Sequence, residues 1–187
     1  MAKKKSRTAL IAVIAVLVIF LAVFIGVNKS LGGKMKEVSK AFTEGLEADY
    51  GISIYDHIKV RIDTSNNMQT IAAKYEDVMS EYRTLRFTRN ELYDLLLEGK
   101  DLGAIHDANE RLTEAFDNVY VKLAPLVTPK ELGYVEEYKS TMDNAQRKIE
   151  ENSYNANVKK LYDEVLNKFP ASILKHLCWT KPPQYFE

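Results

Sequence analysis

The hydrophobic pattern of the chain begins with a run of 19 residues that contains no charged side chain. Residues 9–27 read ALIAVIAVLVIFLAVFIGV, with nothing more polar than Gly26. As a helix this run is roughly 28 Å long, close to the roughly 30 Å hydrocarbon core of a bilayer. A helix is required because backbone groups without hydrogen bonds are too costly in lipid. The pattern predicts a transmembrane helix over 9–27.

The flanks of this run predict its fate and its orientation. A cleaved signal peptide is the alternative, but its apolar region is shorter, and Gly26-Val27-Asn28 is a poor cleavage context. We therefore expect a retained anchor. Four basic residues precede the run within a basic tail at residues 1–8, which predicts a cytoplasmic N-terminus. These residues are Lys3, Lys4, Lys5 and Arg7. A short flexible linker is predicted at 28–34 because Gly32 and Gly33 break helices.

After residue 34 the apolar positions recur at helical spacing. A short helix is predicted over 35–47, and longer ones over about 53–97 and 101–124, with Gly99 and Pro125 as their stops. The run from Leu92 to Leu97 either continues the first of these long helices or follows a kink. The third long helix has the clearest start. Thr128 can cap it, Pro129 fits its first position and Glu131 completes a capping box. This helix is predicted to run to Phe169, with a last short helix over 171–178.

No alternating strand pattern competes with these helices. The fold class predicted is all-α: an N-terminal transmembrane helix followed by an antiparallel helical bundle over 35–178. The bundle would contain three long helices plus a short one and resemble a four-helix bundle. Residues 179–187 contain two prolines, which predict an extended C-terminal tail.

Composition and charge narrow the classes of function. Of the 187 residues, 46% are hydrophobic, and 26 basic residues balance 26 acidic ones. Because four basic residues lie before the apolar run, the rest of the chain is mildly acidic. Nucleic acids are therefore not expected as partners, since phosphate contacts need a basic field. One cysteine, Cys178, excludes an internal disulfide and is expected to be a structural thiol.

The C-terminal third carries a family resemblance. Tyr154-Asn155-Ala156-Asn157-Val158 is followed by Tyr162, Phe169-Pro170 and a terminal Tyr185-Phe186-Glu187. Together with the N-terminal membrane segment, the order of these motifs resembles the LemA family. Arg61-Ile62-Asp63 with Asn67 is similar to a helix of the same family. Glu151 replaces a usual basic residue, so the chain resembles a divergent member. The resemblance implies a helical bundle outside the cytoplasm and no reaction.

The residues offer few candidates for chemistry. None of the three histidines has the Glu-x-x-His spacing of bundle metal sites, and no phosphate-binding glycine motif occurs. We expect no catalytic, metal or cofactor site and no enzyme activity. Two groups of residues are singled out instead. A structural polar layer between the first and last long helices is predicted from Arg61, Asp63, Asn67 and Asn155. A partner-binding tail is predicted from Trp179, Tyr185 and Phe186, with docking onto the protein's own surface as the alternative.

Two functions remain open at this point. The first is an extracytoplasmic interaction or scaffold module, a single-pass membrane protein held in the lipid bilayer by 9–27, whose partner is another protein of the cell envelope. The alternative is a ligand-sensing bundle, which needs a polar-lined cavity of a few hundred cubic ångströms.

Overall fold

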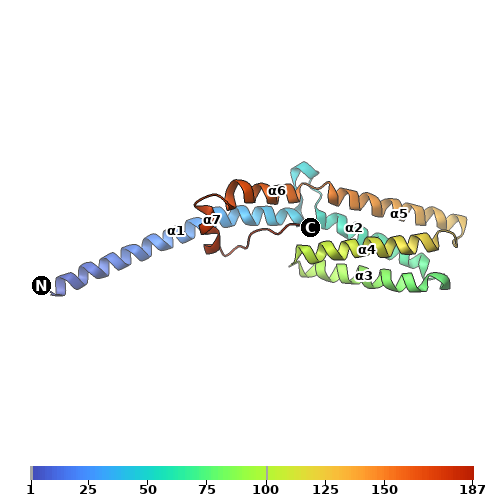
Figure 1. The fold of residues 1–187 in the computed structure, drawn as a ribbon, viewed down its shortest axis with the longest axis horizontal. Coiled ribbons are helices and arrows are strands. Elements are labelled where there is room, and N and C mark those ends of the chain that lie inside the picture. Colours follow the sequence, from blue (N-terminus) through green and yellow to red (C-terminus); the bar gives the residue numbers. More distant parts are fainter. Residues whose placement is uncertain (1, 100) are drawn as a thin grey trace. The chain divides into compact units, whose positions relative to one another are not determined.

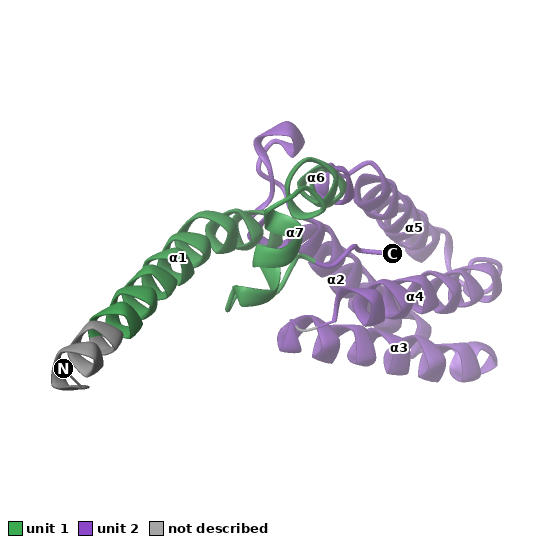
Figure 2. Cartoon of the chain, turned by 60° about the vertical axis from the view of Figure 1, so that its left-hand side comes forward, with its two compact units in different colours: residues 1–39, 157–183 green, residues 40–156, 184–187 purple. Residues whose placement is uncertain are grey.

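The computed structural model describes the backbone of residues 2–99 and 101–187, and side chains from residue 11 onward. All regular structure in these residues is helical, as the sequence predicts (Figure 1). The chain divides into two compact units (Figure 2). Unit 1 contains residues 1–39 and 157–183, and unit 2 contains residues 40–156 and 184–187.

The first helix, α1 (Ala2–Glu44), contains the apolar run. Large apolar side chains between Ile11 and Ile25, apart from the partly buried Phe24, are 46–66% exposed. Exposure of so many is abnormal for a surface in water. This N-terminal helix is long and apolar enough to cross a membrane, and its most apolar 18-residue stretch has a mean hydropathy of 3.0. The side chains of the predicted basic tail, residues 1–8, lie outside the described residues.

The linker predicted at 28–34 is wrong, because α1 continues through these residues without a break. The short helix predicted over 35–47 is its C-terminal end. A glycine inside a helix costs only about 1 kcal/mol relative to alanine, and burial of apolar side chains can offset that cost. Leu31 and Met35 are buried with Leu161 and Leu166 in the core of unit 1. Packing therefore outweighs the two glycines.

The C-terminal part of unit 1 consists of short helical segments. They are the end of α6 (Tyr154–Leu161), the π-helical turn η3 (Tyr162–Leu166), α7 (Ala171–Leu174) and the 3₁₀ turn η4 (Lys175–Leu177). Apolar side chains from these segments and from α1 pack around the buried cluster. The single body predicted over 35–178 is thus divided between the two units.

Unit 2 contains four helices that we call the four-helix body. They are α2 (Ile54–Ala72), α3 (Met79–Glu98), α4 (Leu102–Leu123) and α5 (Pro129–Glu150). The turn η1 (Glu47–Asp49) precedes them. Helix α2 packs against α5 and α3, and α3 packs against α4. Successive helices run in opposite directions (Figure 1).

The helix predicted over 53–97 is two helices, separated by Ala73–Tyr75 and the turn η2 (Glu76–Val78). Ile71, Val78 and Leu85 are all buried, and their spacing of seven residues is what a continuous helix would also produce. The reversal contains no glycine or proline, the usual signals of a turn. The pattern of apolar residues therefore concealed a hairpin.

The helix predicted over 129–169 is also interrupted, because α5 ends at Glu150 and α6 begins at Tyr154. The Asn152 side chain accepts a hydrogen bond from the Tyr154 N–H at 2.9 Å. The Asp49 carboxylate accepts from the N–H and hydroxyl of Ser153, at 3.0–3.2 Å. These bonds satisfy backbone and side-chain donors at the new helix start, where Asn and Ser are favoured.

Replacement of Gly33 tests whether 28–34 is helical. A Cβ at Gly33 meets no atom within 4 Å, so Gly33→Ala should stabilise α1 by about 0.5–1 kcal/mol. Gly133→Ala in α5, also without a neighbour within 4 Å, is the matched control. Thermal unfolding of the full chain in detergent micelles, followed by circular dichroism, measures both. If Gly133→Ala stabilises the protein and Gly33→Ala does not, residues 28–34 are a flexible linker and not part of α1.

Candidate functional site

Arg61 on α2 is fully buried in the four-helix body. Its guanidinium donates to the Thr113 hydroxyl and, at 3.4 Å, to the Asn109 carbonyl, both on α4. Burial lowers the pKa of Arg61 to about 10, although acidic residues led by Glu110 oppose that shift. Arg61 is therefore still charged at neutral pH. Its Nε and Nη1 atoms have no hydrogen-bond partner in the described part of the chain.

Further polar side chains extend from this arginine toward the surface. Asn109 donates to Gln146 on α5 at 3.1 Å. Gln146 in turn donates to Glu110 at 3.0 Å and to Glu150 at 2.9 Å. A hydrogen-bonded network therefore joins α2, α4 and α5. A buried polar network of this kind favours one specific arrangement of the helices.

The polar layer predicted from the sequence has different members from this network. Arg61 belongs to the network, but Asp63 and Asn67 are exposed on α2. Asn155 lies in α6 and bonds elsewhere. Arg61 makes buried polar contacts, but none of them is to Asp63, Asn67 or Asn155. The true partners lie on α4, about 50 residues further along the chain.

Asn155 binds the last residues of the chain. Its side-chain N–H donates to the Phe186 carbonyl at 2.9 Å, and its oxygen accepts from the Phe186 N–H at 2.8 Å. The Tyr154 hydroxyl donates to the Gln184 carbonyl at 2.8 Å. The Gln184 side chain accepts from the Leu102 N–H at 3.2 Å. Residues 184–187 are therefore held by unit 2.

Of the three aromatic residues predicted to bind a partner, Phe186 is part of the core. It is 5% exposed and packs against Phe42, with ring centroids 5.7 Å apart, and against His106, at 5.1 Å. Tyr185 is half-buried. Trp179 belongs to unit 1 and is 82% exposed. Phe186 is therefore docked on the protein itself. Of the three predicted residues, Trp179 is the one whose side chain is largely exposed.

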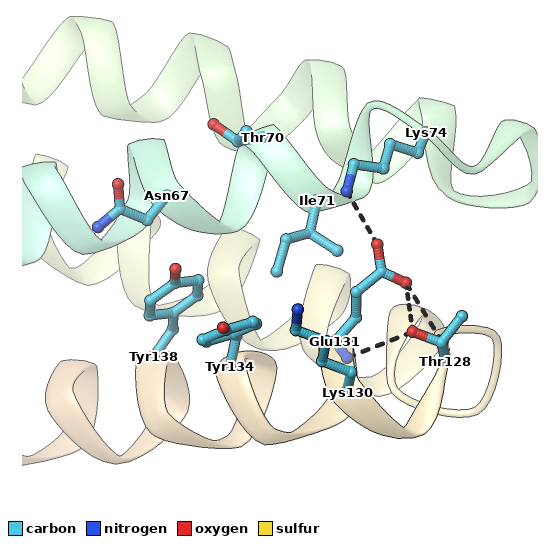
Figure 3. A pocket seen from close by; sticks show the side chains of 9 residues that line it. All are labelled: Asn67, Thr70, Ile71, Lys74, Thr128, Lys130, Glu131, Tyr134 and Tyr138. Carbon is cyan, nitrogen blue, oxygen red and sulfur yellow. Dashed lines mark hydrogen bonds and ion pairs between the residues drawn. The ribbon is translucent and has the colours of Figure 1, made fainter.

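A groove of about 490 Å³ lies between α2 and α5 (Figure 3). Its lining combines aromatic rings, charges and an apolar side chain. The lining residues are Asn67, Thr70, Ile71, Lys74, Thr128, Lys130, Glu131, Tyr134 and Tyr138. The Tyr134 and Tyr138 side chains extend from α5 toward α2 (Figure 3). The sequence predicts no groove here, because the lining residues come from two separate helices.

Glu131 lies at one end of this groove and accepts hydrogen bonds from three side chains. Its carboxylate accepts from Tyr75 at 2.6 Å, from Lys74 at 2.9 Å and from the Thr128 hydroxyl at 2.9 Å. Thr128 and Glu131 form the capping box that the sequence predicts for α5. The hydrogen bond from Lys74 is the main cause that lowers the pKa of Glu131 to about 2. The same pair raises the pKa of Lys74.

The remaining titratable candidates do not assemble into a site. Among the described residues, no group of three His, Cys, Asp or Glu side chains could hold a metal ion. Burial lowers the pKa of His57 and raises the pKa of Cys178. The Cys178 thiol lies 3.9 Å from the Val27 carbonyl and packs with the core of unit 1. The features on which a function can be built are therefore the apolar part of α1, the groove and the bound tail.

Comparisons of the chain with protein-family models, with curated proteins and with solved structures gave no match. The resemblance to LemA proteins therefore depends on the motif residues alone. In this structure two residues of the first motif, Tyr154 and Asn155, form hydrogen bonds with Gln184 and Phe186 near the C-terminus.

The pH dependence of stability tests the role of Glu131. The pKa of Glu131 falls from 4.5 to about 2 on folding, so its stabilisation is complete above pH 4.5 and is lost as pH falls toward 2. Glu131→Gln should therefore lose stability less steeply than the unmodified protein over this range. Urea unfolding of the full chain at several pH values measures the difference. Glu137→Gln, on the exposed side of α5, is the control, and parallel curves for Glu131→Gln and wild type would refute the assignment.

Loss of the Asn155 side chain should free the last residues of the chain. Asn155→Ala removes both hydrogen bonds to the Phe186 backbone and should destabilise unit 2 by about 1–3 kcal/mol. The Phe186 amide should also exchange its hydrogen faster, which mass spectrometry of C-terminal peptides detects. Asn66→Ala, at an exposed position of α2, should change stability by less than about 0.5 kcal/mol. Unchanged exchange at Phe186 would contradict the tail contact.

Proposed function

We propose that this protein is a membrane-anchored interaction module of the LemA type. Its four-helix body is an antiparallel bundle outside the cytoplasm, and the groove between α2 and α5 contacts another protein of the cell envelope. The exposed apolar run in α1 is the observation that carries the proposal. Side chains 46–66% exposed along this run require a cover other than water, and a bilayer provides one of the right thickness.

The orientation follows from charge. Four basic residues precede the apolar run, and basic residues favour the cytoplasmic side of a membrane. The helices α2–α7 all follow the other end of the run in the chain. On this basis the N-terminus is cytoplasmic and the helices α2–α7 are extracytoplasmic.

The groove supports binding because of its lining. Tyrosine buries a ring while its hydroxyl keeps a polar contact, which makes it common where proteins meet. Tyr134 is 45% exposed, and Lys130 adds an exposed cation beside it. A peptide segment with apolar and acidic side chains fits this combination.

A ligand-sensing role is the second candidate, and the size of the groove favours it. Its volume of about 490 Å³ falls within the range of roughly 300–1,000 Å³ typical of small-molecule sites. The groove is lined by hydrogen-bonding groups from both helices, as such a site requires. A small molecule would occupy the same surface as the protein partner.

Site-specific photocross-linking in intact cells tests the interaction. A photoreactive phenylalanine analogue is placed at Tyr134 in the groove or, as the control, at Tyr93 on α3. The two tyrosines are almost equally exposed, at 45% and 44%. We expect a protein adduct from position 134 and none of the same mass from position 93.

A second change separates groove binding from chance contact. Lys130→Glu reverses the exposed charge beside Tyr134 and should reduce the yield of the Tyr134 adduct by about tenfold, the equivalent of ~1.4 kcal/mol. Identical adducts from positions 134 and 93 would refute the groove as the contact surface. An adduct lost on addition of a small-molecule extract would favour the ligand-sensing role.

A further inference from the structure

Residues 171–180 of unit 1 expose three side chains. Ile173, His176 and Trp179 are the exposed members of this segment, and they recur at every third residue. Ile173 is 63% exposed and Trp179 is 82% exposed. On the opposite side Ala171, Leu174 and Cys178 pack against the core of unit 1, which includes Leu31 and Met35 of α1. The segment is therefore fixed on α1 by its inner side.

Asn28 of α1 fixes the height of Trp179 along this helix. The Trp179 backbone N–H donates to the Asn28 side-chain oxygen at 2.8 Å. The Asn28 side-chain nitrogen donates to the Leu177 carbonyl at 3.3 Å and to the Phe24 carbonyl at 2.9 Å. The Trp179 ring meets the Phe24 ring edge to face, with centroids 5.3 Å apart and planes at 75°.

This contact places the exposed ring at the end of the apolar run. Phe24 lies three residues before Val27, the last residue of the run, which corresponds to roughly 4.5 Å along a helix. The bilayer that covers Phe24 must therefore reach the Trp179 ring. Tryptophan is enriched at this level of membranes, because its ring is apolar and its N–H is polar.

We propose that the face formed by Ile173, His176 and Trp179, which we call the interfacial face, lies in the headgroup region of the bilayer that α1 crosses. This proposal rests on the membrane anchoring proposed above and adds a second site of lipid contact, far from the first in sequence. Lys29 and Lys181 are exposed close to Asn28 and Trp179 in the sequence. Their long side chains can reach lipid phosphates while Trp179 occupies the boundary.

This second contact would restrict how α1 rotates and tilts in the bilayer. A single transmembrane helix can rotate about its axis and tilt freely, whereas interfacial tryptophans restrict both. The interfacial face belongs to one segment that packs against α1, so its contact with headgroups would favour one rotation of α1. Unit 1 is thereby attached to the bilayer surface as well as through it.

Trp179 is the only tryptophan in the chain, so its fluorescence reports directly on this proposal. The full chain is reconstituted in vesicles of phosphatidylcholine and phosphatidylglycerol that carry a nitroxide quencher either near the headgroup or deep in the acyl chains. Iodide in the buffer quenches tryptophans exposed to water. We expect Trp179 to be quenched several-fold more by the shallow nitroxide than by the deep nitroxide or by iodide.

Two variants in a Trp179→Phe background calibrate the depth. Phe20→Trp lies one turn deeper than Phe24, roughly 6 Å, and should respond most to the deep nitroxide. Glu37→Trp lies ten residues beyond Val27, roughly 15 Å, outside a headgroup region roughly 5–7 Å thick on each side. Its fluorescence should respond most to iodide. Both positions are exposed on α1, so neither variant should disturb packing.

The outcomes separate the two proposals. If Phe20→Trp responds to the deep nitroxide but Trp179 behaves like Glu37→Trp, the interfacial face is refuted and the anchor stands. If the chain fails to float with vesicles in a density gradient, both are refuted. Preferential quenching of Trp179 by the deep nitroxide would also overturn the headgroup placement, because the ring would then lie inside the hydrocarbon.

Discussion

One helix has two different surroundings, and the rest of the structure depends on that. Between Ile11 and Ile25, α1 exposes its large apolar side chains except Phe24, and from Leu31 to Phe42 the same helix buries most of its apolar residues against other parts of the chain. The change occurs at Asn28, the first polar residue after the apolar run. Its side chain binds α1 itself at Phe24 and the C-terminal segment at Leu177 and Trp179. The end of the exposed apolar surface and the start of the protein core therefore coincide.

The elements that could be predicted from the sequence are those with strong local signals. The apolar run and the capping box of Thr128 and Glu131 each depend on residues close together in the chain. The two missed breaks in helix, at 73–78 and 151–153, lack such signals or have them within a continuing apolar stripe. Gly32 and Gly33 gave the opposite error. They suggested a break where the packing of Leu31 and Met35 keeps the helix intact.

The candidate residues show the same limit. Arg61 was recognisable as a polar residue on an apolar stripe, but its partners Asn109 and Thr113 depend on which helix faces α2. That choice is set by tertiary packing, which single-helix periodicity does not contain. Asn155 and Phe186 were each singled out, although for different roles. No local pattern relates residues separated by 31 positions, so their mutual hydrogen bonds could not be foreseen.

The C-terminal segment contributes residues to both compact units. The chain passes between the units three times: within α1, within α6 and between Pro183 and Gln184. Two of these crossings are continuous helix, and the third follows two prolines, which restrict the backbone. Residues 177–179 are bonded to α1 within unit 1, and residues 184–186 are bonded to unit 2. A tail free at either end would leave Phe186 out of the core or Trp179 away from Phe24. The aromatic residues of this tail therefore act locally in each unit, one in a protein core and one, on our proposal, at a lipid surface.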